Sequence, residues 1–193
     1  MSDLKRIGFE QSQSDPCVLR LMMEGEVMGM VAIHVDDILY TGTKSLAKVV
    51  VEALDDSLPT KNLGEVKFFL GCAFIRDREA GAIEISQESY IRSVLDRFNI
   101  CCTSPFPASL ANDNRSLMED EGAGDVPSRE VVGSLMWIAN QTRPDISNAV
   151  RAVARHSHER KKSHWKAAQK ILDYLLETAH LTLKFKQDSR TLR

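Results

Sequence analysis

The chain is organised around one stretch, which reads Val27-Met28-Gly29-Met30-Val31-Ala32-Ile33-His34-Val35-Asp36-Asp37-Ile38-Leu39-Tyr40-Thr41-Gly42. A mostly apolar run meets two adjacent carboxylates, and a second apolar run follows at once. Two short apolar segments joined by a two-residue polar turn predict a β-hairpin with Asp36 and Asp37 at its tip. We therefore expect strands over residues 27–35 and 38–40.

The neighbouring carboxylates at this tip repel each other unless a cation lies nearby. Mg²⁺ favours one or two carboxylates together with substrate phosphates, so the pair is half of a two-metal phosphoryl-transfer site. Aspartate is also a common turn residue, and a solvated turn explains the same two residues. Both interpretations stay open at this stage. His34, directly upstream, is expected to be a partly buried, hydrogen-bonded residue rather than a ligand.

Composition narrows the class of protein. The chain has 193 residues, of which 43% are hydrophobic and 27% charged, a balance typical of a soluble globular protein with one domain or two small lobes. No apolar run approaches the ~20 residues that span a bilayer, so no membrane partner is expected. The four cysteines (Cys17, Cys72, Cys101 and Cys102) lack CxxC spacing, which indicates neither a zinc site nor a disulfide framework. A reducing, intracellular setting is expected.

Charge is unevenly distributed, although the net charge is only −2. Acidic residues crowd one stretch: Asp113, Glu119, Asp120, Glu121 and Asp125. Basic residues crowd a later one, against Glu159 alone: Arg151, Arg155, Arg160, Lys161, Lys162, Lys166 and Lys170. One basic face on a neutral body and an ordinary solvated helix face explain this pattern equally well. If it binds nucleic acid, the candidate contacts are Arg151, Arg155, Lys161, Lys162 and Lys166.

The patterns along the chain predict an α+β fold. A polar leader (residues 1–16) precedes a strand at 17–23, and a helix over about 45–58 follows the hairpin. One strand is expected over 67–76, a second at 83–85, and a helix capped by Ser86 up to about residue 98. Residues 101–126 form a long linker with prolines, glycines and acidic residues. Three helices beginning near residues 127, 144 and 163, and a strand at 181–185, complete the chain.

Other polar groupings carry weaker signals. His156, His158 and His164 have no fixed helical spacing, which disfavours a metal cluster. Arg143-Pro144-Asp145 is explained by a helix start, where proline and aspartate are both favoured. No glycine-rich phosphate loop and no Ser-His-Asp or Cys-His signature is present.

Several motifs occur together in one order along the chain. They are Gly8-Phe9-Glu10-Gln11-Ser12, His34-Val35-Asp36-Asp37-Ile38-Leu39, Asn62-Leu63-Gly64, Phe68-Phe69-Leu70-Gly71, Ile85-Ser86-Gln87, Val132-Gly133-Ser134-Leu135-Met136-Trp137 and Thr142-Arg143-Pro144-Asp145-Ile146. In this order they resemble the C-terminal part of a reverse transcriptase from a copia-type LTR retrotransposon polyprotein. His34 occupies the aromatic position of that family's Tyr-x-Asp-Asp box.

The resemblance implies a polymerase architecture and chemistry. It assigns residues 1–100 to a partial polymerase palm, 101–126 to a linker and 127–193 to a helical thumb and connection segment. It makes Asp36 and Asp37 the catalytic carboxylates, with Asp36 bridging two Mg²⁺ ions and Asp37 supporting them. It implies an RNA or DNA template–primer and a dNTP as partners, and the cytoplasm, a virus-like particle or the nucleus as the location.

The departures from the family pattern lead to further expectations. The family takes a third catalytic aspartate from a strand upstream of this box, and no such strand fits before Val27. We therefore expect a fragment that lacks the fingers and first half of the palm, exposes a sheet edge and does not polymerise DNA alone. The alternatives are a non-catalytic nucleic-acid-binding remnant and a pseudogene product without function.

Overall fold

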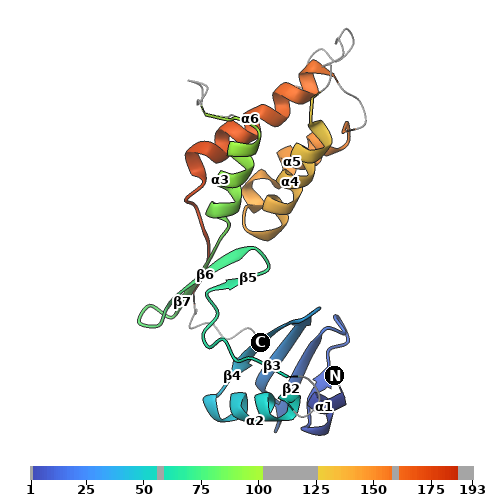
Figure 1. Ribbon diagram of the computed structural model, residues 1–193, viewed down its shortest axis with the longest axis vertical. Helices are drawn as coiled ribbons and strands as arrows, with labels where there is room; N and C mark the ends of the chain where they lie inside the picture. Colours follow the sequence, from blue (N-terminus) through green and yellow to red (C-terminus); the bar gives the residue numbers. More distant parts are fainter. Residues whose placement is uncertain (1, 56–58, 102–125, 158–160, 187–193) are drawn as a thin grey trace. The chain divides into compact units, whose positions relative to one another are not determined.

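The computed structural model describes residues 2–55, 59–101, 126–157 and 161–186 (Figure 1). The chain divides into two compact units, Met1–Val66 and Lys67–Arg193, here called the N-terminal and C-terminal units. Each has its own sheet, and each is described by itself.

The N-terminal unit combines a four-stranded antiparallel sheet with two helices (Figure 1). The elements are α1 (Ser2–Arg6), β1 (Glu10–Gln11), β2 (Val18–Met23), β3 (Glu26–His34), β4 (Asp37–Gly42) and α2 (Lys44–Asp55). The strands follow the order β1-β2-β3-β4, so β1 and β4 are the edges of the sheet. The core contains Leu4, Phe9, Leu19, Val31, Val50 and Leu54, which come from both helices, from β2 and β3, and from the segment before β1.

The expected polar leader is wrong. Residues 2–6 form α1, residues 10–11 form β1, and Leu4 and Phe9 are almost completely buried. Two apolar residues five positions apart in a polar segment give no periodic signal, and only contact with the sheet reveals their burial.

The hairpin forms as predicted, but its turn lies one residue earlier. β3 ends at His34 and β4 begins at Asp37, so Val35 and Asp36 make the turn. This register places Gly29 opposite Gly42 and Val31 opposite Tyr40. A side chain at Gly29 would lie 2.8 Å from Cδ2 of Leu46, so the glycine lets α2 approach the sheet. The packing of α2 and the Val31–Tyr40 pair favour this register.

The C-terminal unit has a second antiparallel sheet and a helical bundle. Its elements are β5 (Phe68–Phe69), β6 (Cys72–Asp77), β7 (Ala82–Ser86), α3 (Glu88–Arg97), α4 (Ser128–Gln141), the 3₁₀ turn η1 (Pro144–Ile146), α5 (Ser147–Ala154), α6 (Lys162–Thr178) and β8 (Leu183–Lys186). The sheet order is β5-β6-β7-β8, so the last strand returns to pair with β7. The predicted cap by Ser86 is wrong by one residue: Gln87 holds the N-cap position of α3 without a side-chain capping bond, and Ser86, the last residue of β7, accepts a hydrogen bond at Oγ from the Glu88 N–H (3.1 Å).

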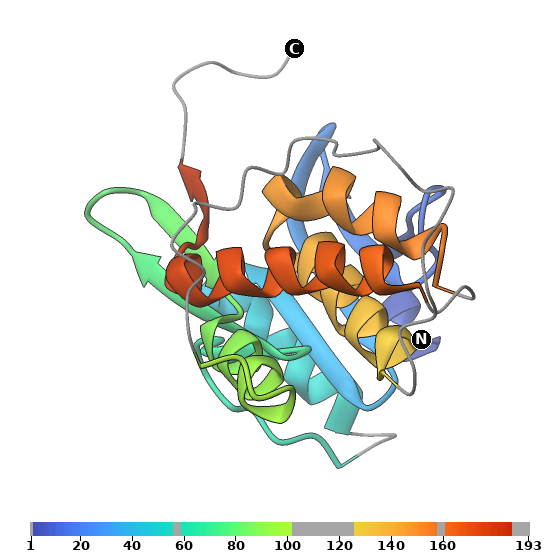
Figure 2. The same ribbon diagram turned by 90° about the horizontal axis from the view of Figure 1, so that it is seen from above.

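The helical bundle has one continuous apolar core. The long helix α6 contacts α3, α4 and α5, and these helices are seen around it in Figure 2. Buried residues at helical spacing fill the space between them, including Ile91, Leu135, Ile138, Leu172 and Leu175. These helices agree with the predicted apolar stripes.

The strand expected over residues 67–76 is wrong, because it is interrupted. Leu70 and Gly71 form a two-residue turn between β5 and β6, and both have positive φ (49° and 78°). Positive φ at both central residues is typical of the tight hairpin turn that matches strand twist. A continuous apolar run hides such a turn, because Leu70 is a rare residue at this conformation.

The α+β prediction is confirmed. The assignment of residues 1–100 to a palm part and 127–193 to a thumb part stays a prediction, and most of the expected linker and its acidic residues lie outside the described residues. Within the described part of the chain, no helix is both long and apolar enough to cross a bilayer.

Candidate functional site

The carboxylates of the hairpin are exposed at the end of the N-terminal sheet. Asp36 lies in the turn, and Asp37 is the first residue of β4, opposite His34. Across the described residues, neither carboxylate has a hydrogen bond or an ion pair with a protein group. His34 is exposed rather than partly buried, because it is the last residue of its strand. The site is two neighbouring, unneutralised acids.

The turn that holds them is strained. Val35 has a φ of 54° and its side chain is 83% exposed. A β-branched residue in the left-handed region costs roughly 1–2 kcal/mol, and glycine or asparagine avoids this cost. The strand register therefore imposes an unfavourable conformation beside the two acids. Backbone strain of this kind is typical of functional sites.

The two faces of this sheet differ. Val31, Ile33, Ile38 and Tyr40 pack in the core, next to the helices. Because side chains alternate along a strand, Asp37 belongs to the opposite face. That face also carries His34, Ala32, Leu39, Arg20 and Met30, as the register requires. The helices of the N-terminal unit cover only the first of these faces.

The donor set fits a divalent cation only in part. Mg²⁺ binds one or two protein carboxylates and completes its shell with water and substrate phosphates. Asp36 and Asp37 could supply that part of the shell. No group of three or more His, Cys, Asp or Glu suited to a metal occurs among the described residues. The described residues around this hairpin therefore do not provide a complete set of protein ligands for a divalent cation.

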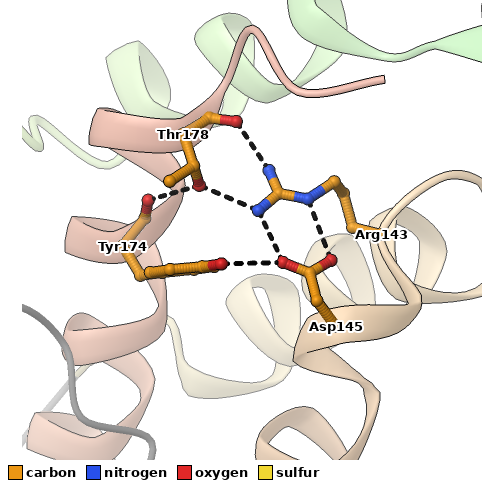
Figure 3. A network of polar contacts seen from close by, with 4 residues as sticks. All are labelled: Arg143, Asp145, Tyr174 and Thr178. Atoms are coloured by element: carbon orange, nitrogen blue, oxygen red, sulfur yellow. Dashed lines mark hydrogen bonds and ion pairs between the residues drawn. The ribbon is translucent and has the colours of Figure 1, made fainter. Parts of the chain in front are cut away.

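A second polar site, which the sequence patterns do not reveal, lies in the C-terminal unit (Figure 3). Arg143 is only 2% exposed and donates from Nε and Nη2 to the two oxygens of Asp145 (3.0 and 2.8 Å). It also donates to the carbonyl oxygen and the Oγ1 of Thr178, both at 2.8 Å. Tyr174 donates its hydroxyl proton to Asp145 (3.0 Å). The network ties the start of η1 to the end of α6.

Electrostatics in this network favour the ionised carboxylate. Burial alone raises the pKa of Asp145, but the hydrogen bonds from Arg143 and Tyr174 and the arginine charge outweigh it, so the pKa lies below its usual value. Burial, followed by the bond to Asp145, raises the pKa of Tyr174. Next to Arg143, Thr142 donates to the buried Gln87 (2.8 Å), which joins the end of α4 to the start of α3. These contacts fix where three helix ends meet.

The basic candidates lie on α5, on α6 and in the segment between them. Arg151, Arg155, Lys162 and Lys166 are exposed, whereas Lys161 is half-buried. The rings of His156 and His164 stack with centroids 4.4 Å apart, and His158 and Arg160 lie outside the described residues. The structure thus keeps four of the five candidates accessible to a ligand.

Comparison with known proteins decides the family. The profile of the family "Reverse transcriptase (RNA-dependent DNA polymerase)" matches residues 2–109, which include the Asp36-Asp37 hairpin. The chain belongs to the reverse transcriptase family. No solved structure matches it significantly.

Its relatives are copia-type retrotransposon Pol polyproteins. The chain is 34% identical to the retrovirus-related Pol polyprotein from transposon TNT 1-94 of Nicotiana tabacum, over 92% of its own length and 14% of the relative. It is 30% and 32% identical to the retrovirus-related Pol polyproteins from transposons RE2 and RE1 of Arabidopsis thaliana, over 91% of its own length and 12% of theirs. The chain spans about a seventh or less of these relatives.

Membership of the reverse transcriptase family suggests a catalytic role for the Asp36-Asp37 site but not for the Arg143 network. Polymerases of this family act on nucleic acid and use a divalent metal, which carboxylates such as Asp36 and Asp37 can bind. The Arg143 network lies outside the matched residues 2–109. The sequence contains one local sign of it, an arginine two residues before an aspartate, but Tyr174 and Thr178 join only through tertiary contact.

Proposed function

We propose that this chain contributes the Asp-Asp carboxylates of an RNA-directed DNA polymerase of a copia-type retrotransposon. The single observation that carries the proposal is the placement of Asp36 and Asp37. They lie at a strained hairpin turn, exposed and without protein partners among the described residues, in a chain of the reverse transcriptase family.

The residues have separate roles in this proposal. Asp36, in the turn, and Asp37, on the helix-free face, would hold the divalent cations through their carboxylate oxygens. When bound, the ions lower the pKa of the primer 3′-hydroxyl and stabilise the leaving group. The strained turn holds the two carboxylates apart from neutralising groups, so their charge stays available to cations.

The Asp-Asp pair is an incomplete ligand set for two cations. Two adjacent acids bind Mg²⁺ only weakly, and positioning supplies most of the rate of phosphoryl transfer. We propose that a segment upstream in the polyprotein supplies a third aspartate and holds the template and the nucleotide. The free edge of β4, directly after Asp37, offers backbone groups with which such a segment can pair.

Primer extension tests this proposal. The 193-residue chain is expected to incorporate no nucleotides on a primed RNA template. The transcript upstream of the Met1 codon should be sequenced, and any in-frame extension expressed with the chain. The longer protein should then show Mg²⁺-dependent synthesis that Asp36→Asn abolishes and Asp15→Asn, at an exposed loop aspartate, leaves intact. Templated synthesis by the 193-residue chain alone, or by the Asp36→Asn protein, would contradict the proposal.

A second candidate is nucleic-acid binding without catalysis, through Arg151, Arg155, Lys161, Lys162 and Lys166. The exposure of four of these side chains favours it. Duplex binding that weakens steeply with salt, in a protein that never incorporates nucleotides, is its expected signature.

A further inference from the structure

The helix α6 presents three lysines in a line on its outer face. Lys162, Lys166 and Lys170 are all exposed and are spaced four residues apart. Four residues advance an α-helix by ~6 Å and return nearly to the same face. The inward face of the same helix, with Ala168, Ile171, Leu172 and Leu175, is buried in the bundle core. We call the three side chains the lysine ladder.

Two arginines lie on or next to the adjacent helix α5, and acidic residues follow the lysine ladder along α6. Arg151 of the adjacent helix α5 and Arg155, which directly follows α5, are both exposed and again lie four residues apart, and none of the residues of α5 is acidic. Along the outer face of α6 the next charged residues after Lys170 are Asp173 and Glu177. Burial, and then the charge of Glu177, raises the pKa of Asp173. The outer face therefore changes from basic to acidic at about its midpoint.

This order of charges opposes the helix dipole. Acids stabilise the start of a helix and bases its end, yet α6 has no acid in its first turn and no base in its last. The helix α2 shows the same reversal with Lys44, Lys48 and then Glu52, so reversal alone marks no site. What distinguishes α6 is a third lysine in line and the arginine pair on or next to the helix beside it. A local rule broken over such a length is typical of a binding surface.

The chemistry of the ladder decides between two kinds of partner. Two copies of α6 could pair antiparallel, with Lys162 facing Glu177 and Lys166 facing Asp173 of the other copy. Exposed ion pairs contribute little, association is costly, and lysine and glutamate are depleted at protein interfaces. A polyanion gains far more, because each neutralised phosphate releases condensed counterions.

We propose that the lysine ladder of α6 binds the phosphate backbone of a nucleic acid strand, about one phosphate per lysine, and that Asp173 and Glu177 end this track. The presence of a nucleic acid rests on the proposed function, but binding requires neither Asp36 nor a metal ion. The ladder adds Lys170 to the candidate contacts and leaves out the half-buried Lys161. The strand therefore follows only the N-terminal half of α6.

Equilibrium binding to a fluorescent RNA–DNA hybrid duplex, in EDTA and over a series of salt concentrations, tests this. The full chain with Lys162→Gln, Lys166→Gln and Lys170→Gln should bind at least about tenfold more weakly at low salt, and the slope of log K against log salt should fall by about 2–3. The matched control is Lys44→Gln with Lys48→Gln on α2, which should change neither value. Glutamine keeps a helix propensity near that of lysine, and circular dichroism checks that each variant is folded.

A second variant, which is expected to strengthen duplex binding instead of weakening it, complements this test. Asp173→Asn with Glu177→Gln should tighten duplex binding several-fold, because the acids that end the track lose their charge. An unchanged affinity and salt slope in the ladder variant would overturn the proposal. So would equal losses in the α2 control, or a wild-type dimer in sedimentation velocity that the ladder variant abolishes while duplex binding persists. Because the titration is done in EDTA and without nucleotides, its outcome is independent of whether the catalytic proposal holds.

Discussion

The two aspartate sites of this chain are treated in opposite ways by the fold. Asp145 in the C-terminal unit accepts two bonds from a buried arginine and one from Tyr174, and its pKa is lowered. Asp36 and Asp37 in the N-terminal unit receive no such partner within the described residues, and a strained valine precedes them. A carboxylate that stabilises the fold is neutralised by other side chains of the same chain. A carboxylate left unneutralised at a strained turn is available to something outside the chain.

The largest expected effect is removal of the arginine from the neutralised site. Arg143→Met should lower the free energy of unfolding of the C-terminal unit by about 3 kcal/mol, because it removes the cation paired with Asp145 and leaves the buried carbonyl oxygen of Thr178 without its donor. Both tryptophans, Trp137 and Trp165, belong to this unit, so fluorescence during urea unfolding reports on it alone. Arg92→Met, at an exposed ion pair with Glu88, is the control and should cost about 0.5 kcal/mol or less. Equal losses in the two variants would contradict the assigned role of Arg143.

A smaller effect is expected on the pH dependence of stability, through Asp145. Asp145 has a lower pKa in the folded than in the unfolded chain, so its ionised form stabilises the fold above its unfolded-state pKa. This contribution is lost as the pH falls through the folded-state pKa, below about pH 4. Asp145→Asn should therefore reduce stability at neutral pH by about 1 kcal/mol, a modest value because the side chain is 39% exposed.

The same variant should flatten the dependence of stability on pH in the acid range. Urea unfolding at a series of pH values, again followed by fluorescence, measures both quantities. Asp77→Asn, at a turn aspartate that bonds only backbone N–H groups, serves as the comparison. An Asp145→Asn protein that keeps the full acid dependence of the wild type would show that the network does not hold the carboxylate ionised.

The smallest effect concerns the strained turn. Val35→Gly should raise the stability of the hairpin by about 0.5 kcal/mol, because relief of the positive φ exceeds the extra entropy of glycine in the unfolded chain. Val27→Gly, at an exposed strand position of β3, should lower it by a similar amount. Hydrogen exchange of the β3 amides measures both changes. Loss of stability in the Val35→Gly protein would mean that the turn is relaxed rather than strained.

The sequence predicted what periodicity can encode. The amphipathic stripes of α2, α3, α4 and α6 and the Asp-Asp hairpin all follow from local patterns, and the family follows from its motifs. The position of the turn depended on tertiary packing, namely on a register that places Gly29 opposite Gly42 and lets Leu46 of α2 pack close to Gly29. The β5–β6 turn depended on Leu70 adopting a conformation that leucine rarely takes.

The Arg143 network marks the limit of sequence reasoning about sites. A helix start accounts for Pro144 and Asp145, and it gives no reason for an arginine at position 143 to be buried. The reason is Thr178, thirty-five residues later, whose carbonyl oxygen the guanidinium satisfies at the end of α6. Only the packing of α6 against η1 and α4 brings these groups together.

Titration with Mn²⁺, a paramagnetic substitute for Mg²⁺ at oxygen ligands, tests the contrast between the two sites most directly. Amide signals of residues 34–38 should broaden first, and this should disappear in an Asp36→Asn, Asp37→Asn protein. The amide signals of Arg143 and Asp145 should stay sharp, because Arg143 already neutralises Asp145. Broadening that is equal at Asp145, or that persists at the hairpin after both substitutions, would contradict the assignment of Asp36 and Asp37 as the metal-binding carboxylates.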